Sequence, residues 1–151
     1  RIKMYWDDYY WQEEDFDRGW CMQCKNGCQE GEVMFLHYCA WDSARFEFVD
    51  VNVNQIQIRV VAGVDDTTSP LCLQRSGDAT SLELCNVADP LQHWEATMGG
   101  FDEEFFEFSQ FYNGEDYCVT THHHPKYGEI IEMFTCDVAR FDTTSYWTKF
   151  Q

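Results

Sequence analysis

Three consecutive histidines, residues 122–124, form the group of side chains best suited to metal chemistry in this sequence. On a β-strand His122 and His124 would point to the same side, because side chains alternate between the two faces. Two imidazoles and a carboxylate such as Asp116 or Glu129 make a ligand set that suits Zn²⁺ or Cu²⁺. The simpler interpretation is an exposed loop that binds nothing. We predict no obligate cofactor and keep a divalent-metal site at His122 and His124 as a hypothesis.

The eight cysteines favour disulfide chemistry over metal–thiolate chemistry. Cys21 and Cys24 have the spacing of half a zinc site, but Cys28 and Cys39 do not supply a second pair at a similar spacing. A high and even cysteine content is typical of secreted proteins. The chain begins at Arg1, shows no signal-peptide segment and has no apolar run of about 18 residues. We therefore expect a secreted chain with a processed N-terminus and no membrane partner.

The charge of the chain excludes one class of partner. Its 151 residues include 27 acidic and 10 basic side chains, so the formal net charge is −17 and the isoelectric point lies near 4.3. Such a chain repels the phosphates of nucleic acids and of anionic membranes. The acidic residues gather within 7–17 and 102–104, and we interpret them as a solvated surface because no calcium-loop spacing is present. We predict no nucleic-acid partner.

No catalytic constellation is recognisable in the sequence. It contains no nucleophile elbow, no phosphate-binding loop and no His-Glu-x-x-His motif. Carboxylates are abundant, but nothing in their spacing distinguishes one pair from the others. With the cysteines assigned to disulfides, a thiol nucleophile is not expected either. We therefore predict that the protein is not an enzyme.

The cysteines repeat along the chain, and this repeat indicates the elements that position the side chains considered so far. Cysteine pairs separated by 18, 13 and 18 residues mark three units. An aromatic residue follows each pair at a nearly constant distance, namely Phe48, Trp94 and Trp147. Pairing within each unit leaves Cys24 and Cys28 to close a small local loop. The predicted disulfides are Cys21–Cys39, Cys72–Cys85, Cys118–Cys136 and Cys24–Cys28.

Each unit is predicted to contain four β-strands. Alternating apolar and polar residues, the pattern of a half-buried strand, open the units at 1–6, 55–60 and 105–110. Further apolar stretches precede the later cysteines at 33–36, 81–84 and 130–134. Helical periodicity is missing, so helices should be scarce. We expect an all-β fold, a single disulfide-stabilised β-trefoil domain over residues 1–151, with repeats at about 1–53, 54–103 and 104–151.

The three units resemble those of the ricin B-type lectins, which are β-trefoils. Each repeat of that family carries a Cys before an apolar residue, an apolar stretch that ends in Cys, and then a Gln-x-Trp element. The resemblance implies a core role for Gln92 and Trp94, and it implies a glycan as the ligand. The matching segments are 71–74, 82–85 and 92–94 in the second unit, 117–120, 128–136 and 145–147 in the third, and 20–23, 31–39 and 46–48 in the first.

In this family a galactose site uses an Asp two residues after the first Cys and an aromatic ring two residues before the second. The residues at these positions are here Gln23 and His37, then Gln74 and Glu83, then Thr120 and Phe134. The third unit keeps an aromatic ring, and Glu132 replaces the family's upstream Gln. The resemblance therefore implies a carbohydrate-binding site at Thr120, Glu132 and Phe134 in a secreted binding or adhesion module.

Aromatic residues make up 17% of the chain and crowd beside the acidic clusters, at 5–11 and 101–112. Core filling is one explanation, and an exposed aromatic surface that docks another subunit is the other. The alternative function is therefore a self-assembling structural subunit of an extracellular filament or surface assembly. The loop at 67–70 could have one of two further roles. It could carry O-linked sugar at Thr67, Thr68 and Ser69, or it could inhibit a protease.

Overall fold

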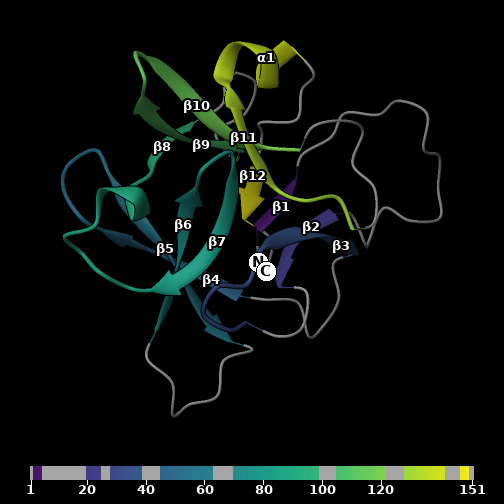
Figure 1. Ribbon diagram of the computed structural model, residues 1–151, viewed down its shortest axis with the longest axis vertical. Helices are drawn as coiled ribbons and strands as arrows, with labels where there is room; N and C mark the ends of the chain where they lie inside the picture. Colours follow the sequence, from purple (N-terminus) through teal and green to yellow (C-terminus); the bar gives the residue numbers. More distant parts are fainter. Residues whose placement is uncertain are drawn as a thin grey trace.

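β-Strands dominate the computed structural model of the chain, which describes residues 2–4, 20–24, 28–38, 45–62, 70–98, 105–121, 128–141 and 147–149 (Figure 1). The helical elements of these residues are short: α1 (Cys136–Phe141) and a 3-10 turn (Pro90–Gln92). The expectation of an all-β protein is confirmed. The strands are β1 (Ile2–Met4), β2 (Trp20–Cys24), β3 (Met34–Tyr38), β4 (Arg45–Asp50), β5 (Ile56–Ala62), β6 (Leu71–Ser76), β7 (Ala79–Leu84), β8 (Glu95–Met98), β9 (Phe105–Tyr112), β10 (Glu115–Thr120), β11 (Glu132–Thr135) and β12 (Trp147–Lys149).

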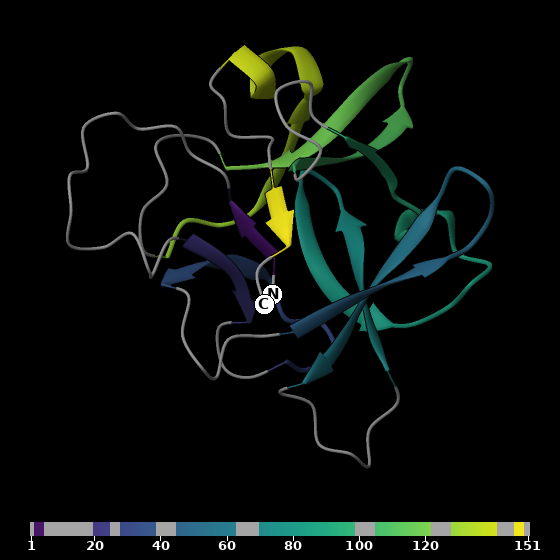
Figure 2. The same cartoon turned by 180° about the vertical axis from the view of Figure 1, so that it is seen from behind.

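The strands form one curled antiparallel sheet, seen from both sides in Figures 1 and 2. Its order is β3-β2-β1-β12-β9-β10-β11-β7-β6-β5-β4, and β8 pairs with β9 off this path. A bridge between Ile56 and Trp94 also brings the start of β8 against β5. The segments predicted as strands at the opening of each unit correspond to β1, β5 and β9.

The hairpins β2–β3, β6–β7 and β10–β11 have the same register. In each hairpin the first cysteine of a unit lies opposite the residue two positions before the second cysteine; these pairs are Cys21–His37, Cys72–Glu83 and Cys118–Phe134. The hairpins also meet one another pairwise, through the pairs Val33–Ser81, Phe35–Ile130 and Ala79–Glu132. The three units predicted from the cysteine spacing therefore share one hairpin geometry.

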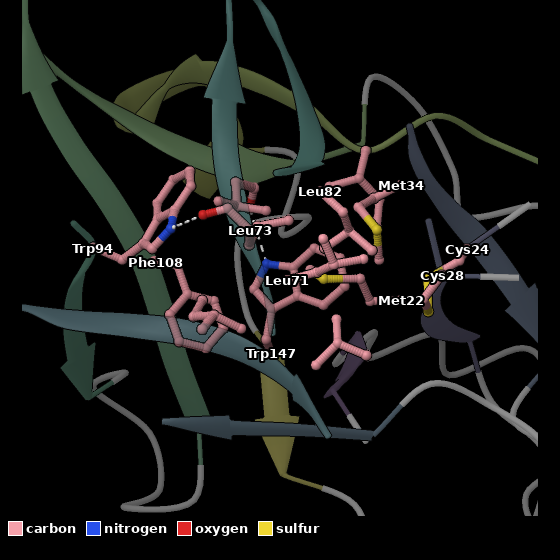
Figure 3. Close-up of a cluster of buried hydrophobic side chains, with 14 of the residues drawn as sticks. Met22, Cys24, Cys28, Met34, Leu71, Leu73, Leu82, Trp94, Phe108 and Trp147 are labelled. Carbon is pink, nitrogen blue, oxygen red and sulfur yellow. Dashed lines mark hydrogen bonds between the residues drawn. A yellow bond between two sulfur atoms is a disulfide. The ribbon is translucent and has the colours of Figure 1, made fainter. Parts of the chain in front are cut away.

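The core is anchored by two buried tryptophans that make the same hydrogen bond in different units (Figure 3). The indole Nε1 of Trp94 donates to the Leu73 carbonyl at 3.0 Å, and that of Trp147 donates to the Val119 carbonyl at 2.9 Å. Leu73 and Val119 each directly follow the first cysteine of their unit. In the first unit Phe48 takes the corresponding place, half-buried against the core without an N–H to donate.

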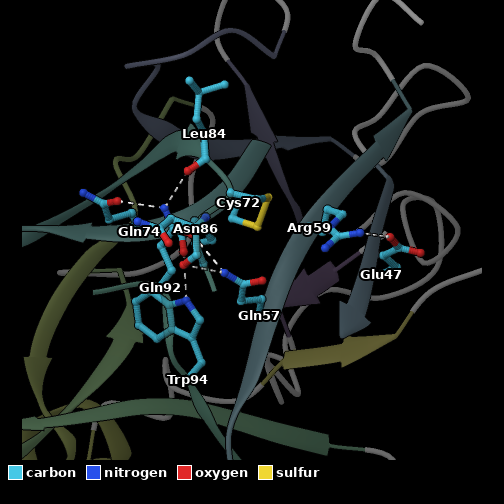
Figure 4. Close-up of a disulfide and its surroundings, with 11 residues drawn as sticks. Glu47, Gln57, Arg59, Cys72, Gln74, Leu84, Asn86, Gln92 and Trp94 are labelled. Atoms are coloured by element: carbon cyan, nitrogen blue, oxygen red, sulfur yellow. Dashed lines mark hydrogen bonds and ion pairs between the residues drawn. A yellow bond between two sulfur atoms is a disulfide. The ribbon is translucent and has the colours of Figure 1, made fainter. Parts of the chain in front are cut away.

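A buried carboxamide holds the second unit together (Figure 4). The Gln92 Nε2 donates to Gln74 Oε1 at 3.0 Å and to the Leu84 carbonyl at 2.9 Å. Its Oε1 accepts from Gln57 Nε2 at 3.0 Å and from the Asn86 backbone N–H at 2.9 Å. Gln92 therefore joins β5, β6 and the segment after β7, which is a core role of the kind that the family resemblance implies.

Disulfides join Cys24 to Cys28, Cys72 to Cys85 and Cys118 to Cys136, as the sequence predicts. Cys21 is also disulfide-bonded, and its predicted partner Cys39 lies outside the described residues. Cys85 and Cys136 directly follow β7 and β11, and Cys136 is also the first residue of α1. Among the described helices none is long and apolar enough to span a membrane.

We predict that Gln92→Ala lowers the free energy of unfolding by about 2–4 kcal/mol, because it leaves several buried donors and acceptors without a partner. Urea denaturation followed by tryptophan fluorescence measures this change. Gln29→Ala, which truncates an exposed carboxamide, serves as the control and should stay within about 0.5 kcal/mol of the unmodified protein. A loss below 1 kcal/mol for Gln92→Ala would show that the network contributes little.

Candidate functional site

The three residues implied as a carbohydrate site lie on one face of the β10–β11 hairpin. Thr120 pairs with Glu132, and Cys118 pairs with Phe134. Directly opposed residues of an antiparallel pair share a face, as do residues two apart along one strand. The structure therefore brings Thr120, Glu132 and Phe134 together, beside the Cys118–Cys136 disulfide.

The three side chains differ in their access to solvent. Thr120 is 1% exposed, and its hydroxyl donates to the Thr121 carbonyl at 3.2 Å. Glu132 and Phe134 are half-buried, so part of each reaches the surface. The face can offer a ligand one carboxylate and part of one phenyl ring, and Thr120 is almost fully buried beside them.

Sequence reasoning missed an ion pair that stands beside this face. Glu107 on β9 is buried, and its two carboxylate oxygens accept from Arg140 Nε at 3.1 and 3.0 Å. Arg140 lies in α1, so the pair fastens the helix to the sheet next to the disulfide that begins it. α1 has six residues, which is too short to produce a helical period in the sequence.

Next to this ion pair, the described residues contain one group that could hold a metal ion, made of Glu107, Cys118 and Cys136. The ligand atoms of these three residues lie within 4.8 Å of one another. Both sulfurs are used in the disulfide, and the carboxylate is held by Arg140. A thiolate must be free to bind a metal ion. We therefore assign this cluster a structural role.

The equivalent face of the second unit is occupied by internal contacts. Gln74, at the Thr120 position, accepts the hydrogen bond from Gln92, and Glu83, at the Phe134 position, accepts one from the Ser81 hydroxyl at 3.2 Å. In the first unit the ring of His37 meets Phe35 edge-on at 6.1 Å. Of the three equivalent hairpin faces, that of the third unit combines a half-buried phenyl ring, Phe134, with a carboxylate, Glu132.

Several candidates from the sequence lie outside the described residues. These are His122 and His124, the acidic clusters within 7–17 and 102–104, the aromatic run at 5–11, and Thr67, Thr68 and Ser69. The aromatic residues at 101–112 are described in part. Phe106 and Phe108 pack with Phe48 in the core, which agrees with core filling, whereas Phe111 is 69% exposed.

A second polar cluster, not anticipated from the sequence, lies where β6 meets the turn between β9 and β10. The Arg75 guanidinium covers the Tyr112 ring at 3.8 Å, and the other side of that ring stacks on Tyr117 at 4.0 Å. Arg75 Nε also donates to Gln110 Oε1 at 3.0 Å. The turn itself is Asn113-Gly114, with positive φ at both residues, as a two-residue type I′ hairpin turn requires.

The Tyr112 hydroxyl in this cluster is buried without a hydrogen-bond partner among the described residues. Burial raises the pKa of Tyr112 above its ordinary 10.0, and this effect outweighs the opposing charge of Arg75. The neutral phenol is therefore the form that the folded protein favours.

Comparison with known proteins finds no family model that matches the chain and no curated protein with a matching sequence. The ricin B-type resemblance therefore rests on the residues of the sequence.

We predict that Tyr112→Phe raises the free energy of unfolding by about 0.5–1 kcal/mol at neutral pH, because it removes a buried hydroxyl that has no partner. Since folding raises the pKa of Tyr112, the unmodified protein loses further stability as the pH rises from the unfolded value of about 10 through the folded value, where the unfolded chain ionises more readily. Between about pH 9 and 11 the free energy of unfolding should therefore fall less in Tyr112→Phe than in the unmodified protein. Urea titrations across this range would contradict the account if the two proteins lost stability in parallel.

Proposed function

We propose that the chain is a single β-trefoil domain of three repeats. The shared register of the three hairpins and their pairwise contacts support this fold. The remaining strands also support it, because β4 pairs with β5, β8 with β9, β9 with β12 and β12 with β1. In a trefoil such strands form a barrel that the hairpins cap.

The function we propose is that of a secreted, non-catalytic module that binds glycans, similar to a ricin B-type lectin. One observation carries this proposal: a half-buried phenyl ring, Phe134, and a carboxylate, Glu132, lie on the same face of one hairpin. The electron-rich face of a ring packs on the C–H face of a sugar, and a carboxylate accepts hydrogen bonds from two neighbouring hydroxyls.

The disulfides support the proposed location. Three disulfides are present in the described residues, and such bonds persist in oxidising compartments and outside the cell. The ion pair between Arg140 and the buried Glu107 and the Cys118–Cys136 disulfide also stand beside the β10–β11 face and stiffen it, as a preorganised binding site needs.

A second candidate is the structural subunit of an extracellular assembly. Phe111 favours it, because this ring is 69% exposed and lies opposite the exposed Asp116 on the β9–β10 hairpin. An exposed aromatic ring suits a contact between subunits, since aromatic residues are enriched at protein interfaces. Electron micrographs of native material showing filaments, together with an empty glycan array, would favour this candidate over the lectin.

We predict that the protein gives signals on a glycan array and that Phe134→Ala weakens its binding to the best glycan at least tenfold, which corresponds to about 1.4 kcal/mol. Phe134→Tyr keeps the ring and should retain most of the affinity. Phe111→Ala, which removes an exposed ring from the adjacent strand, is the matched control and should bind as the unmodified protein does. Circular dichroism checks that each variant is folded. An array without signal, or an unchanged affinity for Phe134→Ala, would contradict the proposed function.

A further inference from the structure

A concave surface lined by residues of β4, β5 and β8 lies apart from the residues of the β10–β11 hairpin. In Figure 1 the loop that joins β4 to β5 is drawn beside β8. Its volume is about 500 Å³, within the range of about 300–1,000 Å³ typical of small-molecule sites. Its lining comes from the end of β4, the loop at 51–55, the start of β5 and the first three residues of β8. None of these residues belongs to the face that carries Glu132 and Phe134.

The cavity has an apolar base and a polar rim. Ile56 and Ala96 are half-buried and pack against the main hydrophobic core, so they form the base. The rim consists of amide, hydroxyl and carboxylate side chains, all exposed except the half-buried Gln55, together with one aliphatic side chain, Val53, which is 98% exposed. The polar lining residues are Asn52, Asn54, Gln55, Thr97, Asp50 and Glu95.

Hydrogen bonds within the loop fix the shape of this rim. Asn52 Nδ2 donates to Gln55 Oε1 at 2.8 Å, and the Asn54 backbone N–H donates to Asn52 Oδ1 at 3.0 Å. The backbone N–H groups of Val51 and Asn52 both donate to the Gln55 carbonyl, at 2.9 and 3.2 Å. A loop held in this way loses little entropy when a ligand binds.

The chemistry of the lining selects the ligand. None of the described lining residues is a lysine, arginine or histidine, while two are carboxylates, so a phosphate, sulfate or acidic sugar would be repelled. The amide and hydroxyl side chains donate and accept hydrogen bonds. Ile56, Ala96 and the exposed Val53 provide apolar contact area between these polar groups. A neutral pyranose ring, with a C–H face and a fringe of hydroxyls, matches this combination.

We infer that the cavity between the β4–β5 loop and β8 is a second glycan subsite, which takes a neutral sugar. This inference rests on the proposed glycan-binding function and adds a site that differs from the hairpin face in position and chemistry. The hairpin face uses an aromatic ring, whereas this cavity uses an aliphatic base and fixed amides. Two such subsites would let one domain hold two residues of a branched glycan or two separate chains.

The test is a titration of the ¹⁵N-labelled full chain with lactose, maltose and cellobiose, followed by amide chemical shifts. We expect at least one of these disaccharides to shift the amides of 52–56 and 95–97. The combined variant Asn54→Ala and Thr97→Ala removes two exposed rim groups without breaking the bonds within the loop. It should weaken this binding at least fivefold. The combined control Gln29→Ala and Ser76→Ala changes exposed side chains outside the cavity and should bind as the unmodified protein does.

Phe134→Ala separates the two proposals. If the shifts of 52–56 and 95–97 persist in Phe134→Ala, the cavity binds sugar independently of the hairpin face. If sugars shift only the β10–β11 amides, or if the double rim variant binds with unchanged affinity, the cavity is not a subsite while the proposed function stands. If none of the three disaccharides shifts the cavity amides, the inference is overturned, and the glycan array decides the proposed function separately.

Discussion

The bond between a buried indole N–H and a backbone carbonyl organises this fold. A buried donor without a partner is costly, so Trp94 and Trp147 can enter the core only where a carbonyl is available. Both find it at the residue after the first cysteine of their unit, on the strand that begins the hairpin. Each bond therefore holds the tryptophan near the fourth strand of a unit against the hairpin of that unit. The hairpins of the second and third units also have the same strand register.

Much of the fold could be predicted because its signals are local. Period-two alternation marked β5 and β9, and the regular cysteine spacing selected the disulfides of the second and third units. Other features depend on contacts that are distant in sequence. α1 is too short to show a helical period in the sequence. The sequence around Glu107 does not indicate that this side chain is buried, because its partner Arg140 lies 33 residues further along the chain. The burial of Thr120 also depends on tertiary packing, and the sequence alone does not indicate it.

In the second unit the side chains at the positions of the family's sugar site make internal contacts. It is the unit most similar to the ricin B-type repeats, yet its Gln74 is bonded to Gln92 and its Glu83 to Ser81. The third unit departs further from the family pattern but leaves Glu132 and Phe134 partly accessible. The unit whose sequence is most similar to the family is therefore not the unit whose side chains at the family's sugar-site positions are partly exposed. The net charge of −17 agrees with neutral ligands and disfavours anionic ones at either proposed sugar site.

The central claim is that one four-strand unit occurs three times, and that in each copy a disulfide joins the first strand of the hairpin to the residue that directly follows the second strand. The most direct measurement is mass-spectrometric mapping of peptides from the non-reduced protein. The account predicts a peptide pair that joins Cys21 to Cys39, the first-unit counterpart of the Cys72–Cys85 and Cys118–Cys136 bonds. A peptide pair that joins Cys21 to any other cysteine would contradict the account, because the first unit would then not be a copy of the other two.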